Sequence, residues 1–410
     1  MMESLARNGY TEEQVRDMLH MKHGSRVVKF RYDILDRFER KKGELSRVIS
    51  GEVSMSAFAT IKRTAKFTLE EENFERMRYY TWQDLDNKTW SEEGGNEFRT
   101  MWALDKELSP MVDWLNDRIQ PFVMFQMPDG GFVEFSLGIF LLSSPVRKDQ
   151  NGQVVREVEA YDGLIILDQD KFTDRHYIKA GTTYESAVRQ ILQSAGITKI
   201  NIDIPSGERL PNDKEYATGD TKLTAINDLL TAINNTPLWV DSSGYYRSSR
   251  YERPEDKPVG YVYSDQELSI IREEAEEEFD LFDVANSWVI TVSNPESEPM
   301  TSRKDNNNPD SPTSIPSRGR RIVDFREVED IASQAALDSY TERIASEASQ
   351  VYGRAKFKTP IMPFHEYYDA IVFQYEPLGI NDKFMETDWT IPLEAGAMME
   401  HEVRKVVSIN

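Results

Sequence analysis

The sequence predicts an α+β fold that is mainly β, in which two β-rich regions flank a small α+β unit. Three observations lead to this prediction. Two apolar runs flank the turn sequence Pro128–Gly131, as in a β-hairpin. Helical and strand-like segments alternate within 181–270. Strand-like runs return after a helical segment at 334–351, close to the C-terminus.

The chain starts with a short helix, which we expect within 1–25. Thr11 and Gln14 have the spacing of a capping box, and an apolar stripe at helical spacing follows them. Gly24 is expected to end the helix, because glycine accepts the left-handed conformation of a helix C-terminus.

The first β-rich region is expected over 26–180, with its first strands at 27–35, 48–58 and 61–69. The last of these alternates with period 2, so one face should be buried and the other wet. The expected buried side chains are Ile61, Ala65, Phe67 and Leu69, and the expected wet ones are Lys62, Thr64, Lys66 and Thr68. Arg63 interrupts the apolar face. We interpret it as a partnered arginine at a barrel end rather than as a ligand site.

A polar, aromatic insert lies near 70–111 and contains Trp82, Trp90 and Trp102. A loop of this length is usually functional or bound to a partner. Its tryptophans could instead pack on the surface of the same domain. The sequence leaves both interpretations open.

The hairpin at 119–144 is the strongest local pattern of the chain. Proline presets φ for the turn, and the two glycines accept positive φ. The side chains expected to share its buried face are Val123, Phe125, Met127, Val133, Phe135 and Leu137. A second hairpin should follow, with 147–152 as its polar turn and 154–160 as its return strand. These paired strands indicate a β-barrel.

The α+β unit is expected over 181–270, after one more apolar run at 164–167. Thr182 and Glu185 form a second capping box, and Gly196 should end that helix. A second helix should begin near Asp220. Strands are expected around 200–204, 237–240 and 245–248, and the unit contains no phosphate-binding loop.

The second β-rich region is expected over 271–410. It should contain a long loop at 294–320, which is rich in Pro, Ser, Asn and Asp and is either ordered or partly disordered. A helix with one apolar stripe is expected at 334–351. The strand-like runs that follow are 355–361, 369–375, 384–393 and 401–409.

Composition excludes several classes of protein. The chain has 410 residues, no cysteine and a net charge of −22. The lack of cysteine excludes disulfides, thiolate zinc sites and a cysteine nucleophile. It also agrees with a protein that is made in a reducing cytosol. No run reaches the ~18 apolar residues of a membrane span, and the polar N-terminus is not a signal peptide. The cluster of Arg318, Arg320 and Arg321 is too short for a basic stripe, so specific nucleic-acid binding is not expected.

Residues of the types that act in catalysis or metal binding are scattered along the sequence. We assign no catalytic, cofactor-binding or metal-binding residue. His20 and His23 could chelate a metal with Asp17, but we favour a surface cluster. His365 has no identifiable partner nucleophile or paired acid. The acidic run at 273–280 lacks the pattern of a calcium loop, so a solvated face is preferred. A glycosidase carboxylate pair stays open, but nothing points to one.

Several short pieces, in their shared order, resemble a known family. They are Ile61–Leu69, Leu137–Phe140, Glu159–Asp162, Gly181–Gly196, Leu223–Trp239, Asp280–Asn286 with the strand after it, Asp310–Ser314 with the basic cluster after it, the helix at Leu337, and Pro363–His365. From about Val27 to its end, the chain resembles the tail hub, or tail-associated lysin, proteins of tailed bacteriophages. More distantly it is similar to the baseplate hub of T-even phages.

The resemblance implies a structural virion protein at the tail tip, made in the host cytoplasm. It implies a homotrimer in which each subunit supplies two tube-like β-barrels, so that three subunits form a ring of six. The expected partners are a distal tail or tail-tube protein, the tape measure protein, and spike, fibre or receptor-binding proteins. The hub would join the tail tube to the tip and close the DNA conduit until infection.

Enzymatic activity is not expected, because the chain ends just after the second β-rich region, without a lysin extension. Two alternatives stay open. One is a tail-associated cell-wall hydrolase. The other is a carbohydrate-binding receptor module that uses Trp82, Trp90 and Trp102 as stacking platforms.

Overall fold

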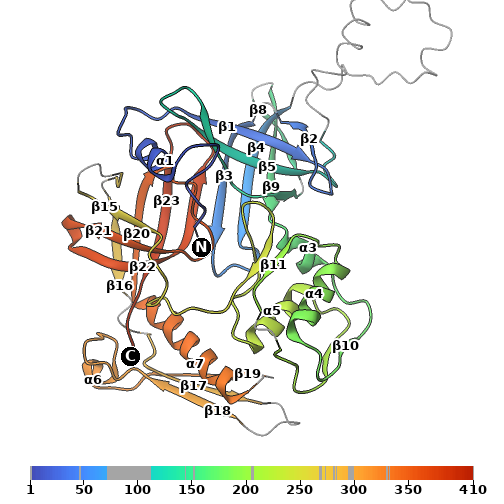
Figure 1. The fold of residues 1–410 in the computed structure, drawn as a ribbon, viewed down its shortest axis with the longest axis vertical. Helices are drawn as coiled ribbons and strands as arrows, with labels where there is room; N and C mark the ends of the chain where they lie inside the picture. The colour runs from blue at the N-terminus through green and yellow to red at the C-terminus, as the bar shows by residue number, and fades with distance from the viewer. Residues whose placement is uncertain are drawn as a thin grey trace, which may run out of the picture.

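The structure is a computed structural model of the whole chain. The residues that it describes are 2–45, 48–71, 112–143, 145–150, 153–204, 207–266, 270–272, 274–279, 282, 284–293, 300–328, 331 and 333–409. The insert near 70–111, with Trp82, Trp90 and Trp102, lies outside the described residues except for its first two positions. Figure 1 shows the two β-rich regions beside each other, with the α+β unit and a helix-containing unit on one side of them.

The first part of the chain contains the N-terminal helix α1 and the first β-rich region. Its elements are α1 (Glu12–Leu19), β1 (Val28–Leu35), β2 (Lys41–Glu44), β3 (Val48–Ser56), β4 (Arg63–Glu71), β5 (Arg118–Gln126), β6 (Phe132–Ser136), β7 (Phe140–Leu142), β8 (Val146–Gln150) and β9 (Gln153–Tyr161). The capping box of α1 is confirmed, since Thr11 and Gln14 exchange both hydrogen bonds. The helix ends at Leu19, not at Gly24, and His20 is its C-cap residue.

The predicted hairpin is confirmed, with Phe125 opposite Val133 and Val123 opposite Phe135. All six side chains expected on its buried face are buried. Gly130 has φ +89° in the turn, which is the conformation that required glycine. The second hairpin differs from the prediction. The segment 147–150 belongs to β8 and not to the turn, because an exposed strand accepts polar side chains as readily as a turn does.

Strand β4 has the predicted alternation, and Ala65, Phe67 and Leu69 are buried. The prediction is wrong for Lys62, which was expected on the wet face. Lys62 is buried because the chain bends before β4 begins, and its ammonium donates hydrogen bonds to the carbonyl oxygens of Ala57 and Ala59.

The α+β unit has its own hydrophobic core. Its elements are α3 (Leu164–Gln169), β10 (His176–Ile178), α4 (Tyr184–Ser194), β11 (Ile200–Ile202), β12 (Lys214–Tyr216), α5 (Lys222–Ala232), β13 (Trp239–Val240) and β14 (Tyr246–Ser248). Helices α4 and α5 begin one residue later than predicted, with Thr183 and Thr221 as N-caps whose hydroxyls accept backbone hydrogen bonds.

The second β-rich region encloses a further unit. The region's strands are β15 (Tyr261–Ser264), β16 (Glu276–Phe279), β20 (Gly353–Pro360), β21 (Ala370–Tyr375), β22 (Ile380–Pro392) and β23 (Met398–Lys405). The enclosed unit consists of β17 (Ser287–Val292), β18 (Thr301–Asp305), α6 (Ile315–Arg318), β19 (Val323–Val328) and α7 (Gln334–Ser349). The segment 294–320 was expected to be a loop, but it contributes β18 and α6. Strand β18 forms because β17 offers it a hydrogen-bonding edge, which composition does not reveal.

The two β-rich regions form one sheet. Strands β22 and β3 pair antiparallel, with Trp389 opposite Met55, and this pairing joins the regions into a sheet of 15 strands. One continuous hydrophobic core includes residues of both regions. The mainly β, α+β class is confirmed. Within the described residues the barrel-like halves belong to one open sheet and are not separately closed barrels.

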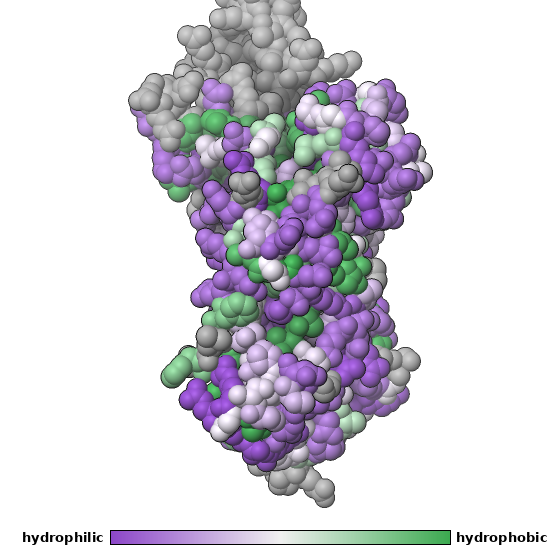
Figure 2. All heavy atoms as spheres, turned by 90° about the vertical axis from the view of Figure 1, so that its left-hand side faces the viewer, coloured by the Kyte–Doolittle hydropathy of each residue, from purple (hydrophilic) through white to green (hydrophobic). Residues whose placement is uncertain are grey.

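Most of the surface in Figure 2 is hydrophilic, with smaller hydrophobic patches between the polar side chains. This agrees with the high charged fraction of the chain, 29%. Among the described residues no helix has the length and apolar character needed to cross a membrane.

Candidate functional site

A buried ion pair connects the two β-rich regions. Arg63 at the start of β4 and Glu366 between β20 and β21 lie 2.5 Å apart (Nη2 to Oε2), and both side chains are almost fully buried. A second guanidinium nitrogen of Arg63 donates to the carbonyl oxygen of Leu137, at 2.9 Å. The expectation that Arg63 has a partner is confirmed, and that partner lies 303 residues away in the sequence.

The α+β unit meets the β-rich regions at the same place. The backbone N–H of Ser242 donates to the second oxygen of Glu366, at 3.0 Å. The carboxylate of Asp162, at the start of the unit, accepts from the backbone N–H groups of Arg63 and Leu164, both at 2.8 Å. We call Arg63, Asp162, Ser242 and Glu366 the junction cluster, because these four residues link three parts of the fold.

Burial dominates the electrostatics of the junction cluster. It raises the pKa of Asp162 to about 6, although two backbone donors and Arg63 favour the carboxylate. Burial also raises the pKa of Glu366 above its ordinary value, and Arg63 opposes this shift. The junction cluster therefore contains one buried ion pair, Arg63–Glu366, and one further buried carboxyl group, that of Asp162. The pKa values of both carboxyl groups depend on the neighbours that are buried with them.

A second buried cluster lies within the second β-rich region. The Nδ1 atoms of His365 and His401 face the two carboxylate oxygens of Glu386, and the Nδ1–Oε1 distance for His401 is 2.5 Å. The hydroxyl of Tyr263 lies 2.5 Å from Nε2 of His365. The hydroxyl of Thr359 lies 2.8 Å from Nε2 of His401. We call His365, Glu386 and His401 the histidine–glutamate cluster.

The surroundings of the histidine–glutamate cluster are aromatic. The ring of Phe357 stacks on His401, with centroids 4.6 Å apart, and Tyr263 stacks on His365. Burial acts to raise the pKa of Glu386, but the two imidazoles hold it below its ordinary value. Burial lowers the pKa of His401. The two imidazoles therefore favour the ionised form of the Glu386 carboxylate.

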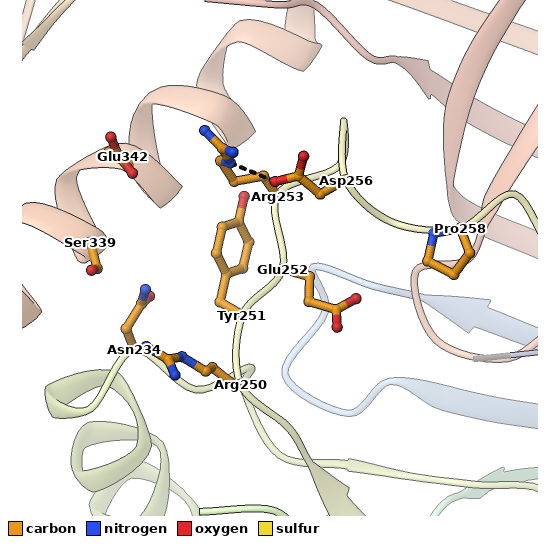
Figure 3. Close-up of a pocket in the computed structure, with 9 residues that line it drawn as sticks. All are labelled: Asn234, Arg250, Tyr251, Glu252, Arg253, Asp256, Pro258, Ser339 and Glu342. Atoms are coloured by element: carbon orange, nitrogen blue, oxygen red, sulfur yellow. Dashed lines mark hydrogen bonds and ion pairs between the residues drawn. The ribbon is translucent and has the colours of Figure 1, made fainter. Parts of the chain in front are cut away.

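A pocket of about 380 Å³ lies between the α+β unit, the linker at 250–258 and α7 (Figure 3). The linker side chains Arg253 and Asp256 form an ion pair across 2.8 Å, which the dashed line in Figure 3 marks. The remaining lining residues are Asn234, Arg250, Tyr251, Glu252, Pro258, Ser339 and Glu342. Charges of both signs line this pocket, so it presents no single ligand chemistry.

The residues that the sequence singled out are otherwise dispersed. His20 lies against Tyr261, and His23 is exposed. Asp17 pairs with Lys22. Among the described residues, only the histidine–glutamate cluster forms a group of three side chains suited to a metal ion.

The acidic run at 273–280 and the basic cluster at 318–321 differ in their surroundings. The described part of the acidic run includes β16, and it is largely exposed. Arg318 donates to backbone carbonyl groups of Phe282 and Val284, and Arg321 pairs with Asp305. Arg318 and Arg321 therefore have partners within the fold.

Sequence reasoning missed Glu366, Glu386 and His401 as members of buried clusters. No local signal singled out Glu386, because β22 contains several other charged and polar residues. Nothing local pointed to Glu366 as the partner of Arg63.

The fold is that of solved tail proteins. A tail protein from Neisseria meningitidis is 10% identical, with a TM-score of 0.59 over 92% of this chain and 96% of that one. A 43 kDa tail protein of prophage MuSo2 from Shewanella oneidensis is 11% identical, with a TM-score of 0.59 over 92% and 98%. A prophage tail protein, gp18, from Listeria monocytogenes is 13% identical, with a TM-score of 0.52 over 91% and 94%.

By sequence, no protein-family model and no curated protein matches the chain. The likeness is thus one of fold, and it extends along nearly the whole length of each chain. At this level it confirms the resemblance to phage tail proteins that the short sequence pieces indicated.

Proposed function

We propose that this protein is a structural hub at the tip of a phage tail, which joins the tail tube to the tip and closes the DNA conduit until infection. The observation that carries the proposal is the β3–β22 pairing within a fold shared with tail proteins. It places two β-rich halves side by side in one sheet. A protein with such a sheet suits a wall segment of a tube.

The proposed assembly is a homotrimer, in which three copies supply six β-rich halves. Closed cyclic symmetry is the usual arrangement of identical subunits. Strands β2 and β16 stand at the two ends of the strand order in the sheet. Unpaired strand edges are templates for pairing with another chain, so contacts between copies at these ends would close a ring. The proposed neighbours are a tail-tube or distal tail protein, the tape measure protein and the spike or fibre proteins.

The test is the copy number and symmetry of this chain in assembled tails, measured by electron microscopy of the tail tip. We expect three copies around one axis at the tip. Any other copy number, or a position along the tube shaft, contradicts the proposed hub. Purified protein is a poorer sample, because a monomer there could still assemble when its neighbours are present.

We further propose that the protein has no cell-wall hydrolase activity. Its most conspicuous titratable clusters are buried and lie outside the pocket of about 380 Å³. A gel containing purified cell wall tests this directly. Clearing that follows the protein through purification and is lost in a single carboxylate variant would contradict it.

A further inference from the structure

The histidine–glutamate cluster brings together three side chains from separate elements. His365 lies between β20 and β21, Glu386 is in β22, and His401 is in β23. The three candidate ligand atoms lie within 4.8 Å of one another, and all three side chains are buried. The outer nitrogen of each imidazole contacts a hydroxyl group, from Tyr263 or Thr359.

This arrangement has the chemistry of a transition-metal site. Two imidazole nitrogens and one carboxylate oxygen are a ligand set that Zn²⁺ accepts. A histidine that binds a metal through one ring nitrogen donates the other N–H to a fixed partner, which orients the ring. The hydroxyl oxygens of Tyr263 and Thr359 are placed to accept these two hydrogen bonds.

The charge of the cluster favours a cation. Among the described ion pairs, Glu386 has only the two histidines as partners and no lysine or arginine. An ionised carboxylate that is buried among aromatic rings is costly unless positive charge compensates it. A divalent cation would supply that charge.

The metal-free alternative is a hydrogen-bonded network. In it both Nδ1–H groups donate to Glu386, and the two hydroxyls donate to the Nε2 atoms. Metal binding requires each histidine to move its proton from Nδ1 to Nε2, which changes no net charge on the rings. It also requires the nitrogen–oxygen contacts to open to about 3.3 Å, the separation of ligands about 2.0–2.1 Å from a tetrahedral zinc.

We propose that His365, Glu386 and His401 bind one divalent transition-metal ion, with zinc preferred, inside the second β-rich region, and that the fourth position of a tetrahedral zinc is left to a small ligand such as water. The ion would tie the segment between β20 and β21 to strands β22 and β23. This proposal is independent of the proposed tail-tip function.

The test measures zinc in the full-length chain. Because the cluster is buried, the protein is refolded from denaturant with zinc and then dialysed against metal-free buffer. We expect about one zinc per chain by elemental analysis. We also expect zinc at 100 times its Kd to shift the unfolding equilibrium about 100-fold toward the folded state. Zinc content near zero, with a melting temperature that neither zinc nor a chelator changes, would overturn the proposal.

Variants locate the ion. His401→Gln and Glu386→Gln should lose the bound zinc, whereas His23→Gln removes an exposed histidine and should keep it. Loss of zinc in His23→Gln, with retention in His401→Gln, would place the ion elsewhere and contradict the proposal. If the cluster variants do not fold, cobalt in the wild-type protein replaces them as the test. Strong visible absorption from a tetrahedral cobalt ion with nitrogen ligands would support the site, and a spectrum of hydrated cobalt would overturn it.

Discussion

At the scale of single residues, the junction cluster concentrates charge where three parts of the fold meet. Arg63, Glu366 and Asp162 are each at most 3% exposed. Hydrogen bonds from Arg63 and Ser242 hold the two oxygens of Glu366. A buried pair of this kind contributes little net stability over an apolar pair, but breaking it leaves polar groups without partners. The main consequence of the Arg63–Glu366 pair is therefore that it fixes the relative positions of the three parts of the fold.

Arg63→Met should destabilise the protein by roughly 3–5 kcal/mol, because it leaves Glu366 buried without its cation. The double variant Arg63→Met/Glu366→Met should recover part of this loss, since it removes both charges. Urea unfolding monitored by tryptophan fluorescence measures both. A single variant that loses less than about 1 kcal/mol, the range of an exposed pair, would show that the pair is not buried in solution.

Asp162 gives a pH dependence whose sign follows from its raised pKa. The folded protein retains this proton up to about pH 6, whereas the unfolded chain releases it near the ordinary carboxyl pKa of 3.8. The contribution of Asp162 to the free energy of unfolding is therefore full below pH 3.8 and falls as the pH rises to 6. The difference is on the order of 3 kcal/mol, at 1.36 kcal/mol per pKa unit.

Chemical unfolding of the wild type and Asp162→Asn between pH 4 and 7 checks this expectation. The stability of the wild type relative to the variant should fall across that range. The comparison cancels the titration of the other groups, and a constant difference would contradict the raised pKa.

At the scale of elements, the connection between β6 and β7 passes close over the junction cluster. Gly138 has φ +129° there, and a Cβ atom on it would lie 2.8 Å from Cδ of Arg63 and 2.9 Å from Cζ of Phe140. Glycine is thus required at this position for two reasons, its backbone conformation and the close approach of the neighbouring side chains.

Gly138→Ala should cost more stability than Gly130→Ala. Both alanines have an unfavourable positive φ, but a Cβ on Gly130 meets nothing within 4 Å. The difference includes the steric clash in the core, which typically costs about 1–3 kcal/mol, and the difference in backbone strain between φ +129° and φ +89°. Thermal unfolding of the two variants measures it. Equal losses would show that the contact between Gly138 and Arg63 is looser in solution.

At the scale of the whole molecule, one sheet of 15 strands, three smaller sheets and three hydrophobic cores organise the described part of the chain. One continuous hydrophobic core lies under the two β-rich regions, so they pack as a single body. The α+β unit and the enclosed unit that contains α7 each have a separate hydrophobic core. They are therefore attached to this body and are not part of its core. The fold similarity to solved tail proteins extends over 92% of the chain, so it includes these attached units as well as the large sheet.

The net charge of −22 leads to an expectation for the whole molecule, which is that the free protein does not bind duplex DNA. Affinity for DNA comes largely from lysine and arginine side chains that displace condensed cations. A gel-shift titration at about 50 mM salt is the fair measurement, since screening is weak there. Submicromolar binding that weakens steeply with salt would contradict a passive DNA conduit and favour a hub that grips the genome end.

Sequence by itself determined the local structure. The hairpin around Pro128–Gly131, the capping box at Thr11 and the helix beginning at Gln334 all followed from periodicity and turn chemistry. These patterns are reliable because the interactions that produce them lie within a few residues of one another. Sequence also indicated the resemblance to tail proteins, through pieces that only their order made recognisable.

Tertiary structure alone decided how the pieces meet. The pairing of β3 with β22, the contact of Arg63 with Glu366, and the convergence of His365, Glu386 and His401 join residues far apart in the chain. Each depends on which apolar faces pack together, and many pairings satisfy the same alternation of apolar and polar residues. For the same reason Lys62 was placed on the wrong face. The alternation of apolar and polar residues does not show where the chain bends. Nor does it show which buried carbonyl groups will accept hydrogen bonds from a side chain such as Lys62.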